Sequence, residues 1–169
     1  MTALSAPTAA TNTELVRWAF GVLNTRDTAP LRTIWTPETV EHFNEVTCRG
    51  TDEIAAYFDM TFAAVPDFHL EPLTVAGEGD HVFGHWRMTG THTGAPFRGI
   101  APSGRRLDLQ GIDHFVIRDG KVVTNTVVFD QLTFARQVGM LPAEGTAGDR
   151  ASKAAFAARL KVASRLRRR

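Results

Sequence analysis

The sequence contains a single cysteine, Cys48, in 169 residues, so no internal disulfide can form. It also lacks a run of apolar residues long enough to span a bilayer and an N-terminal segment with the pattern of a secretory signal. These absences predict a cytoplasmic protein. A chain of this length is one ordinary domain, and it can bury a core without metal ions or disulfides as staples.

Motifs of several enzyme classes are missing as well. No cysteine and histidine have the spacing of zinc ligands, and we expect His81, His85 and His92 to lie on opposite strand faces, so no metal site is predicted. The glycines of segment 77–84 do not form a dinucleotide fingerprint. There is no Gly-x-Ser-x-Gly nucleophile motif. We therefore expect no metal and no cofactor.

Charge is distributed unevenly. Residues 149–169 contain eight Lys or Arg and one Asp, so the net charge of this segment is +7. The net charge of the whole chain is +1, and the rest of the chain therefore has a net charge of −6. Residues 143–148 resemble a linker, which predicts a basic C-terminal tail over 143–169. A basic amphipathic helix with Phe156, Leu160 and Leu166 is one interpretation. A solvated, disordered tail is favoured over it and over weak contact with a membrane surface or nucleic acid.

Helix signals lie in the first half and at the end of the chain. Residues 1–11 are predicted to be disordered, and the Thr-x-x-Glu spacing from Thr11 is a capping box that opens a first helix. A short helix follows near Pro30. A third begins at Asp52 and ends before Pro66. A last short helix is capped by Asp130 and ends near residue 139.

Strand signals dominate after residue 68, and the segment 40–44 is also β-like. Turn sequences at 77–80 and 118–120 separate the strands. Helices followed by antiparallel strands predict an α+β fold.

Alternation along the strands predicts the residues that point inward. Between 82 and 92 the even positions point inward, and all of them, Trp86 and Met88 included, are apolar or small except His92. Between 107 and 117 the odd positions point inward and are apolar except for Asp113. Between 123 and 129 the inward set is Val123, Asn125, Val127 and Phe129, unless a bulge swaps the faces.

An acid among apolar neighbours is costly unless it is hydrogen-bonded or protonated, and desolvation raises its pKa toward values useful for proton transfer. Asp113 is therefore the candidate acid/base residue, and a buried structural acid is the alternative. Asn125 could orient that acid or donate to a substrate oxygen, or be a satisfied strand amide. His92 is a candidate at the pocket rim, with ordinary packing as its alternative.

Four segments arrive in a characteristic order: W-R-M-T-G-T-H-T-G from Trp86, G-I-A-P-S-G-R-R from Gly99, D-H-F-V-I-R-D-G-K-V-V from Asp113, and F-D-Q-L-T-F-A-R-Q-V-G from Phe129. In this order the chain resembles the SnoaL-like polyketide cyclase family, which belongs to the nuclear transport factor 2-like superfamily. The resemblance implies a cone over residues 12–142, a strongly curved sheet closed by helices around an apolar pocket.

The resemblance also bears on the site. Cyclases of this family place a proton-shuttling aspartate three positions before the cap of the last helix, and that position is Val127 here. The pocket histidine of the preceding strand corresponds to Asp113. The Gly-x-His element of the family is present and ends at His92.

The family resemblance implies a cofactor-independent enzyme that cyclises or isomerises a polyketide-like or other apolar carbonyl compound, and commonly a homodimer. The absent acid at Val127 leaves a non-catalytic carrier of a lipophilic metabolite open, and an epoxide hydrolase-like activity is a further alternative. The expected catalytic residues are Asp113, His92 and Asn125. The expected substrate-binding residues are Trp18, Tyr57, Phe58, Phe62, Trp86, Met88, Val127 and Phe129.

Overall fold

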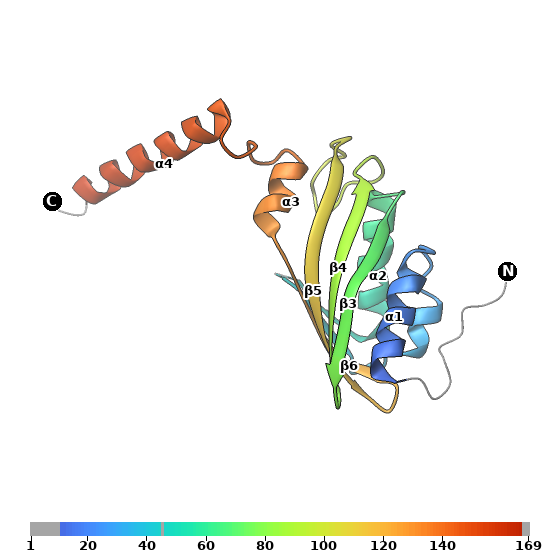
Figure 1. The fold of residues 1–169 in the computed structure, drawn as a ribbon. Coiled ribbons are helices and arrows are strands. Elements are labelled where there is room, and N and C mark those ends of the chain that lie inside the picture. The colour runs from blue at the N-terminus through green and yellow to red at the C-terminus, as the bar shows by residue number, and fades with distance from the viewer. Residues whose placement is uncertain (1–10, 45, 167–169) are drawn as a thin grey trace.

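The computed structural model describes residues 11–44 and 46–166 and forms an α+β fold (Figure 1). Disorder is predicted for residues 1–11, and of these only Thr11 is among the residues that the structure describes. Four strands lie after residue 68, as the sequence predicts. The elements in chain order are α1 (Asn12–Leu23), the 3₁₀ helix η1 (Pro30–Thr33), β1 (Val40–Phe43), β2 (Val46–Arg49), α2 (Gly50–Ala64), β3 (His69–Glu78), β4 (His81–Thr91), β5 (Arg106–Arg118), β6 (Lys121–Phe129), α3 (Gln131–Gln137) and α4 (Ala147–Leu166).

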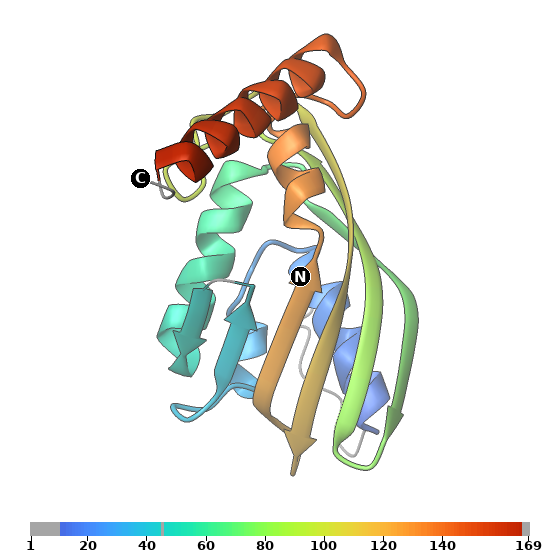
Figure 2. The same cartoon turned by 90° about the vertical axis from the view of Figure 1, so that its left-hand side faces the viewer.

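The strands form one curved, unclosed sheet in the order β2-β1-β6-β5-β4-β3. Figure 2 shows α1 and α2 behind this sheet, on the face toward which it curves. The sheet is mixed, because β1 and β6 pair in parallel, whereas the sequence predicted antiparallel strands throughout. β1 and β6 are far apart in the chain, so no hairpin turn forces them to run in opposite directions.

The predicted capping box begins α1. Thr11 Oγ1 accepts a hydrogen bond from the Glu14 backbone N–H at 3.3 Å, and the Glu14 carboxylate accepts one from the Thr11 backbone N–H at 2.8 Å. The helix then buries an apolar face against the sheet, where the Phe20 and Phe115 rings lie 6.1 Å apart. This packing closes one end of the cone.

The predicted inward faces are confirmed for β4 and β5, whose burial alternates with period two. The prediction for β6 is wrong at one position: Val122 is buried instead of Val123. A register shift between Val116 and Ile117 causes this change, because a bulge moves the residues beyond it to the other face. Asn125 and Val127 keep the inward positions predicted for them.

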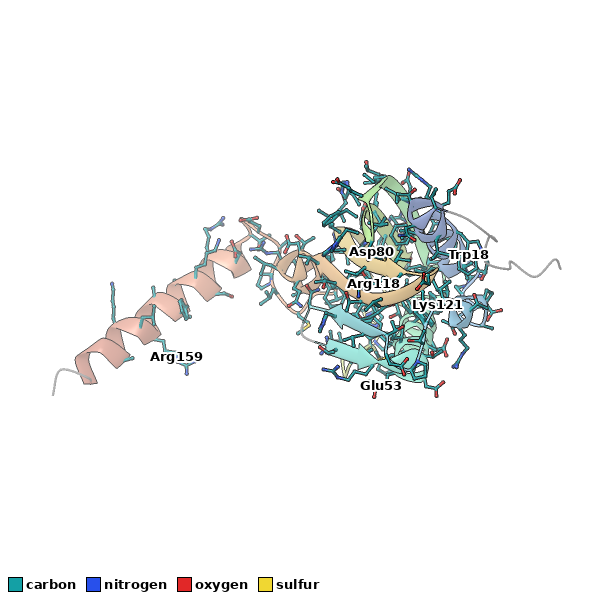
Figure 3. The ribbon with its side chains drawn as sticks, turned by 90° about the horizontal axis from the view of Figure 1, so that it is seen from below. Trp18, Glu53, Asp80, Arg118, Lys121 and Arg159 are labelled. Atoms are coloured by element: carbon teal, nitrogen blue, oxygen red, sulfur yellow. The ribbon has the colours of Figure 1, made fainter. Side chains whose placement is uncertain are left out.

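The basic tail contains a helix where a disordered segment was favoured. α4 extends away from the cone, as Figures 1 and 3 show with Arg159 labelled on it. Phe156 and Leu160 are 63% and 53% exposed, whereas the side chain of Leu166 is not among those described. An alanine-rich sequence with i,i+4 pairs such as Asp149–Lys153 favours a helix even without tertiary contacts. None of the described helices is both long and apolar enough to cross a membrane.

We predict that removing residues 143–169 leaves the folded domain intact. An ion pair between Arg136 and Glu144 would be lost, but Glu144 is 74% exposed and such pairs contribute only about 0–1 kcal/mol. The melting temperature of the truncated protein, followed by circular dichroism, should change by no more than a few degrees. A large fall would show that α4 packs on the domain in solution.

Candidate functional site

A cavity of about 120 Å³ lies inside the cone. Its wall is almost entirely apolar and rich in aromatic rings, and its few polar side chains come from α2, the end of β4 and the middle of β5 and β6. The lining consists of Leu23, Phe43, Tyr57, Phe58, Thr61, Val65, Phe68, Leu70, Trp86, Met88, His92, Phe97, Leu107, Leu109, Asp113, Asn125, Val127, Phe129 and Phe134. Such a cavity suits a small apolar molecule with few polar groups.

Asp113 lies in the middle of β5, paired with Gly84 on one side and Val127 on the other. It is 6% exposed and lines the cavity. Its Oδ1 accepts a hydrogen bond from Trp86 Nε1 at 3.0 Å. Sequence periodicity thus brings the predicted acid to the cavity wall.

Gly111 allows this contact between Trp86 and Asp113. Gly111 pairs with Trp86, and a Cβ added at Gly111 would lie 2.3 Å from the Trp86 ring. The indole therefore lies over the backbone of Gly111 and reaches the carboxyl two residues further along the same face of β5. A larger residue at position 111 would displace the ring and remove the donor from Asp113.

Burial raises the pKa of the Asp113 carboxyl to about 7. Desolvation is the main cause, and hydrogen bonds from Trp86 and Asn125 act in the opposite direction because they stabilise the carboxylate. A carboxyl that titrates near neutral pH can both accept and return a proton under ordinary conditions.

A second buried acid, Glu41, was missed by the sequence analysis. It lies on β1, is 2% exposed, and its Oε2 accepts a hydrogen bond from Asn125 Nδ2 at 3.4 Å. Burial and the nearby Asp113 charge raise its pKa to about 8, whereas hydrogen bonds from Asn125 and Trp35 act to lower it. Alternation with Phe43 is the only sequence signal for Glu41, and a strand of four residues is too short to show which face is inward.

His92 is the third predicted site residue at the cavity. It is 1% exposed, and neither of its ring nitrogens has a hydrogen-bond partner among the described residues. Its backbone is fixed by two hydrogen bonds with 104–105, from the His92 N–H to the Arg105 carbonyl and from the Gly104 N–H to the His92 carbonyl. A buried imidazole whose nitrogens have no partner among the described residues is available to a polar group of a ligand.

Aromatic rings surround the cavity near α3. Phe134 on α3 packs edge-on against Phe97 and Phe129, with ring centroids 6.0 Å and 6.4 Å away. Asp130 caps α3 by accepting hydrogen bonds from the backbone N–H groups of Leu132 and Thr133. The predicted helix cap thus holds one aromatic wall of the site.

Six of the eight predicted substrate-binding residues line the cavity, and two do not. Trp18 lies at the edge of the buried face of α1, on the outside of the body in Figure 3. Phe62 is buried but turns between Phe58 and Phe68, with ring centroids 6.1 Å and 5.2 Å away, and so packs as core behind the wall. These two residues match the helical core pattern but lie outside the lining, because the apolar face of a helix is broader than the strip that borders the cavity.

A model of the SnoaL-like polyketide cyclase family matches residues 13–138. The chain belongs to this family. The match includes the first three motifs, all but the last residue of the fourth, the cavity lining and Asp113, and it ends before the basic tail. No curated protein sequence matches the chain.

Solved structures share the fold. TsrD from Streptomyces laurentii is 27% identical with a TM-score of 0.70, covering 80% of this chain and 99% of its own. A protein assigned to the SnoaL-like polyketide cyclases from Jannaschia sp. CCS1 is 23% identical with a TM-score of 0.69, covering 80% and 100%. AclR from Streptomyces galilaeus, assigned as a hydroxylase, is 23% identical with a TM-score of 0.65, covering 88% and 89%. The assignments differ, so the fold alone does not determine the reaction.

We predict that the cavity tolerates a larger side chain where the core does not. Leu109 and Ile117 are buried on the same face of β5, but only Leu109 borders the cavity. We expect 2-naphthol bound in the cavity to quench the emission of Trp86, which lines it. Leu109→Trp should abolish this binding with little change in melting temperature, because the new ring fills empty space. Ile117→Trp, the matched control, should cost about 1–3 kcal/mol or more through overpacking. Equal destabilisation by both changes would show that no cavity exists at Leu109.

Proposed function

We propose that the protein is a cofactor-independent enzyme that moves a proton at the carbon next to a carbonyl group of an apolar, polyketide-like compound, leading to cyclisation or isomerisation. One observation carries the proposal: Asp113 is a buried carboxyl on the wall of an apolar cavity, with a pKa raised to about 7. Membership of the SnoaL-like polyketide cyclases supports the class of substrate.

In the proposed reaction the Asp113 carboxylate is the base. It takes the proton of the carbon acid, the C–H bond breaks as an O–H bond forms, and the electron pair moves to the carbonyl oxygen as an enolate. Asn125 and His92 are the polar groups that can hold oxygen atoms of the substrate, while aromatic rings hold its flat apolar body. The protonated Asp113 then returns the proton at the same or another carbon.

The proposed role of Asp113 determines the pH dependence. The base must be ionised, and its pKa is raised to about 7. The rate of proton abstraction should therefore rise with pH through about 7 and level off above it.

A carrier of a lipophilic metabolite is the second candidate, and Val127 favours it. This residue is apolar and 7% exposed at the position where cyclases of the family place their acid. The epoxide hydrolase-like alternative has less support, because Arg87 projects from the opposite face of β4 and pairs with Asp108. We also expect a homodimer through the outer sheet face, where Phe83, Ile112 and Val128 are exposed.

We predict that Asp113→Asn lowers the exchange of α-protons of 2-tetralone in D₂O by roughly a hundredfold, because the isosteric amide cannot act as a base. Proton NMR measures this exchange without knowledge of the natural product. The variant should fold, since an amide replaces a desolvated carboxyl of the same shape. Asp108→Asn on the same strand, whose acid faces solvent, is the control and should exchange at the wild-type rate.

Two outcomes would contradict the proposal. Full exchange by Asp113→Asn together with loss in His92→Ala would move the base to the histidine. If the protein binds 2-tetralone and a panel of other aryl ketones but exchanges their α-protons no faster than buffer alone, the carrier is favoured.

A further inference from the structure

A second, smaller cavity of about 30 Å³ lies behind Asp113. Asp113 and Asn125 border both cavities, whereas Glu41 borders only the smaller one. Glu41 is therefore out of reach of a ligand in the larger cavity but close to the residues that touch it. The other lining residues of the small cavity are Ala19, Phe20, Leu23, Leu31, Ile34, Trp35, Phe58, Phe115 and Val122.

The strand register brings these three polar residues together. Asn125 pairs with Glu41 of β1 on one side and with Phe115 of β5, two residues beyond Asp113, on the other. Its Nδ2 donates to Glu41 Oε2 at 3.4 Å, and its Oδ1 is buried with no hydrogen-bond partner among the residues that the structure describes. The Asn125 amide thus lies between two carboxyl groups, and its oxygen can still accept a hydrogen bond.

Within the described part of the chain, no cation lines the small cavity beside the two acids. The described lining of the small cavity contains no lysine, arginine or histidine. Cys48 and Tyr57 interact electrostatically with Glu41, but a thiol and a phenol are either neutral or negative, so neither supplies a positive charge. His92 borders only the larger cavity. Two carboxylates in such surroundings repel each other and cannot both be ionised at low cost.

We propose that Glu41 is a positioning residue that holds a proton behind Asp113, so that the active pair carries one proton on Glu41 and one negative charge on Asp113. The catalytic meaning of this pair rests on the proposed function, whereas its protonation does not. One water in the small cavity completes the connection by donating to Asn125 Oδ1 and contacting the carboxyls, since the volume and three polar neighbours suit a buried water.

The pair explains how a carboxylate persists in an apolar cone. Glu41 stays neutral, so the only charge lies on the acid that faces the ligand. When Asp113 takes a proton from the substrate, the pair becomes neutral, and it recovers its single charge when that proton returns. No ion outside the pair has to move during this cycle.

The pH dependence of protein stability should reveal the raised pKa values of the pair without any substrate. The pKa of Asp113 is raised from 3.8 to about 7 and that of Glu41 from 4.5 to about 8, so the folded protein binds more protons than the unfolded chain between these values. The contribution of these two acids to stability is therefore full below about pH 4 and is lost as pH rises through about 8. We expect Glu41→Gln to make the fall of melting temperature with rising pH about half as steep as in the wild type. Glu38→Gln, at an exposed acid, is the control and should leave this pH dependence unchanged.

Carboxyl ¹³C NMR of the full chain, labelled at Asp and Glu, tests the order of ionisation directly. We expect Asp113 to ionise first and Glu41 at higher pH, and Glu41 in Asp113→Asn to ionise at lower pH than in the wild type because the like charge is gone. Ionisation of Glu41 in the ordinary range of glutamate, or before Asp113, would overturn the proposal. The wild-type titration alone decides this if Glu41→Gln does not fold.

The two proposals fail separately. If Asp113 and Glu41 titrate as expected but no ketone exchanges its α-protons, the proposed enzymatic function is contradicted and the proposed Glu41–Asp113 pair still stands. If Glu41 ionises in the ordinary range of glutamate while α-proton exchange depends on Asp113, the proposed pair is contradicted and the proposed enzymatic function still stands.

Discussion

Desolvation of two carboxyl groups is the constraint on which this site depends. Glu41 and Asp113 are 2% and 6% exposed inside a cone whose other inward residues are almost all apolar. In water both acids would be ionised at neutral pH, but burial raises the pKa of Glu41 to about 8 and that of Asp113 to about 7. The fold thus converts two ordinary carboxyls into groups that keep or release protons near neutrality.

The sheet supplies the precision that such a site requires. β1, β6 and β5 are neighbours, and each contributes one member of the set formed by Glu41, Asn125 and Asp113. Gly111 lets Trp86 lie across β5 and donate to Asp113. Because these side chains come from strands and not from loops, their separations are fixed by register.

Much of the fold could be predicted from short-range patterns. The capping box at Thr11, the cap at Asp130 and the alternation along β4 and β5 are local, and each predicts its element. The alternation also predicts Asp113 as an inward acid. Local patterns fail where distant strands decide the outcome: the parallel pairing of β1 with β6, and with it the place of Glu41, depends on contacts across 84 residues.

Two further differences between the sequence pattern and the structure have similar causes. The shift that moves Val122 inward and leaves Val123 without a partner in β5 has no sequence signal of its own, because both residues are valines and either could point inward. Trp18 and Phe62 satisfy the helical pattern of the core, and only the three-dimensional outline of the cavity separates core from lining. Periodicity identifies buried faces, but it does not show where a buried face borders empty space.

A crystal structure with bound 2-naphthol, a flat phenol that resembles an enolate, tests the central claim most directly. The account predicts that the rings lie between the aromatic walls of the larger cavity and that the hydroxyl oxygen lies within hydrogen-bond distance of Asp113. A phenol bound elsewhere, or one whose oxygen points away from Asp113 toward solvent, would contradict the assignment of the site.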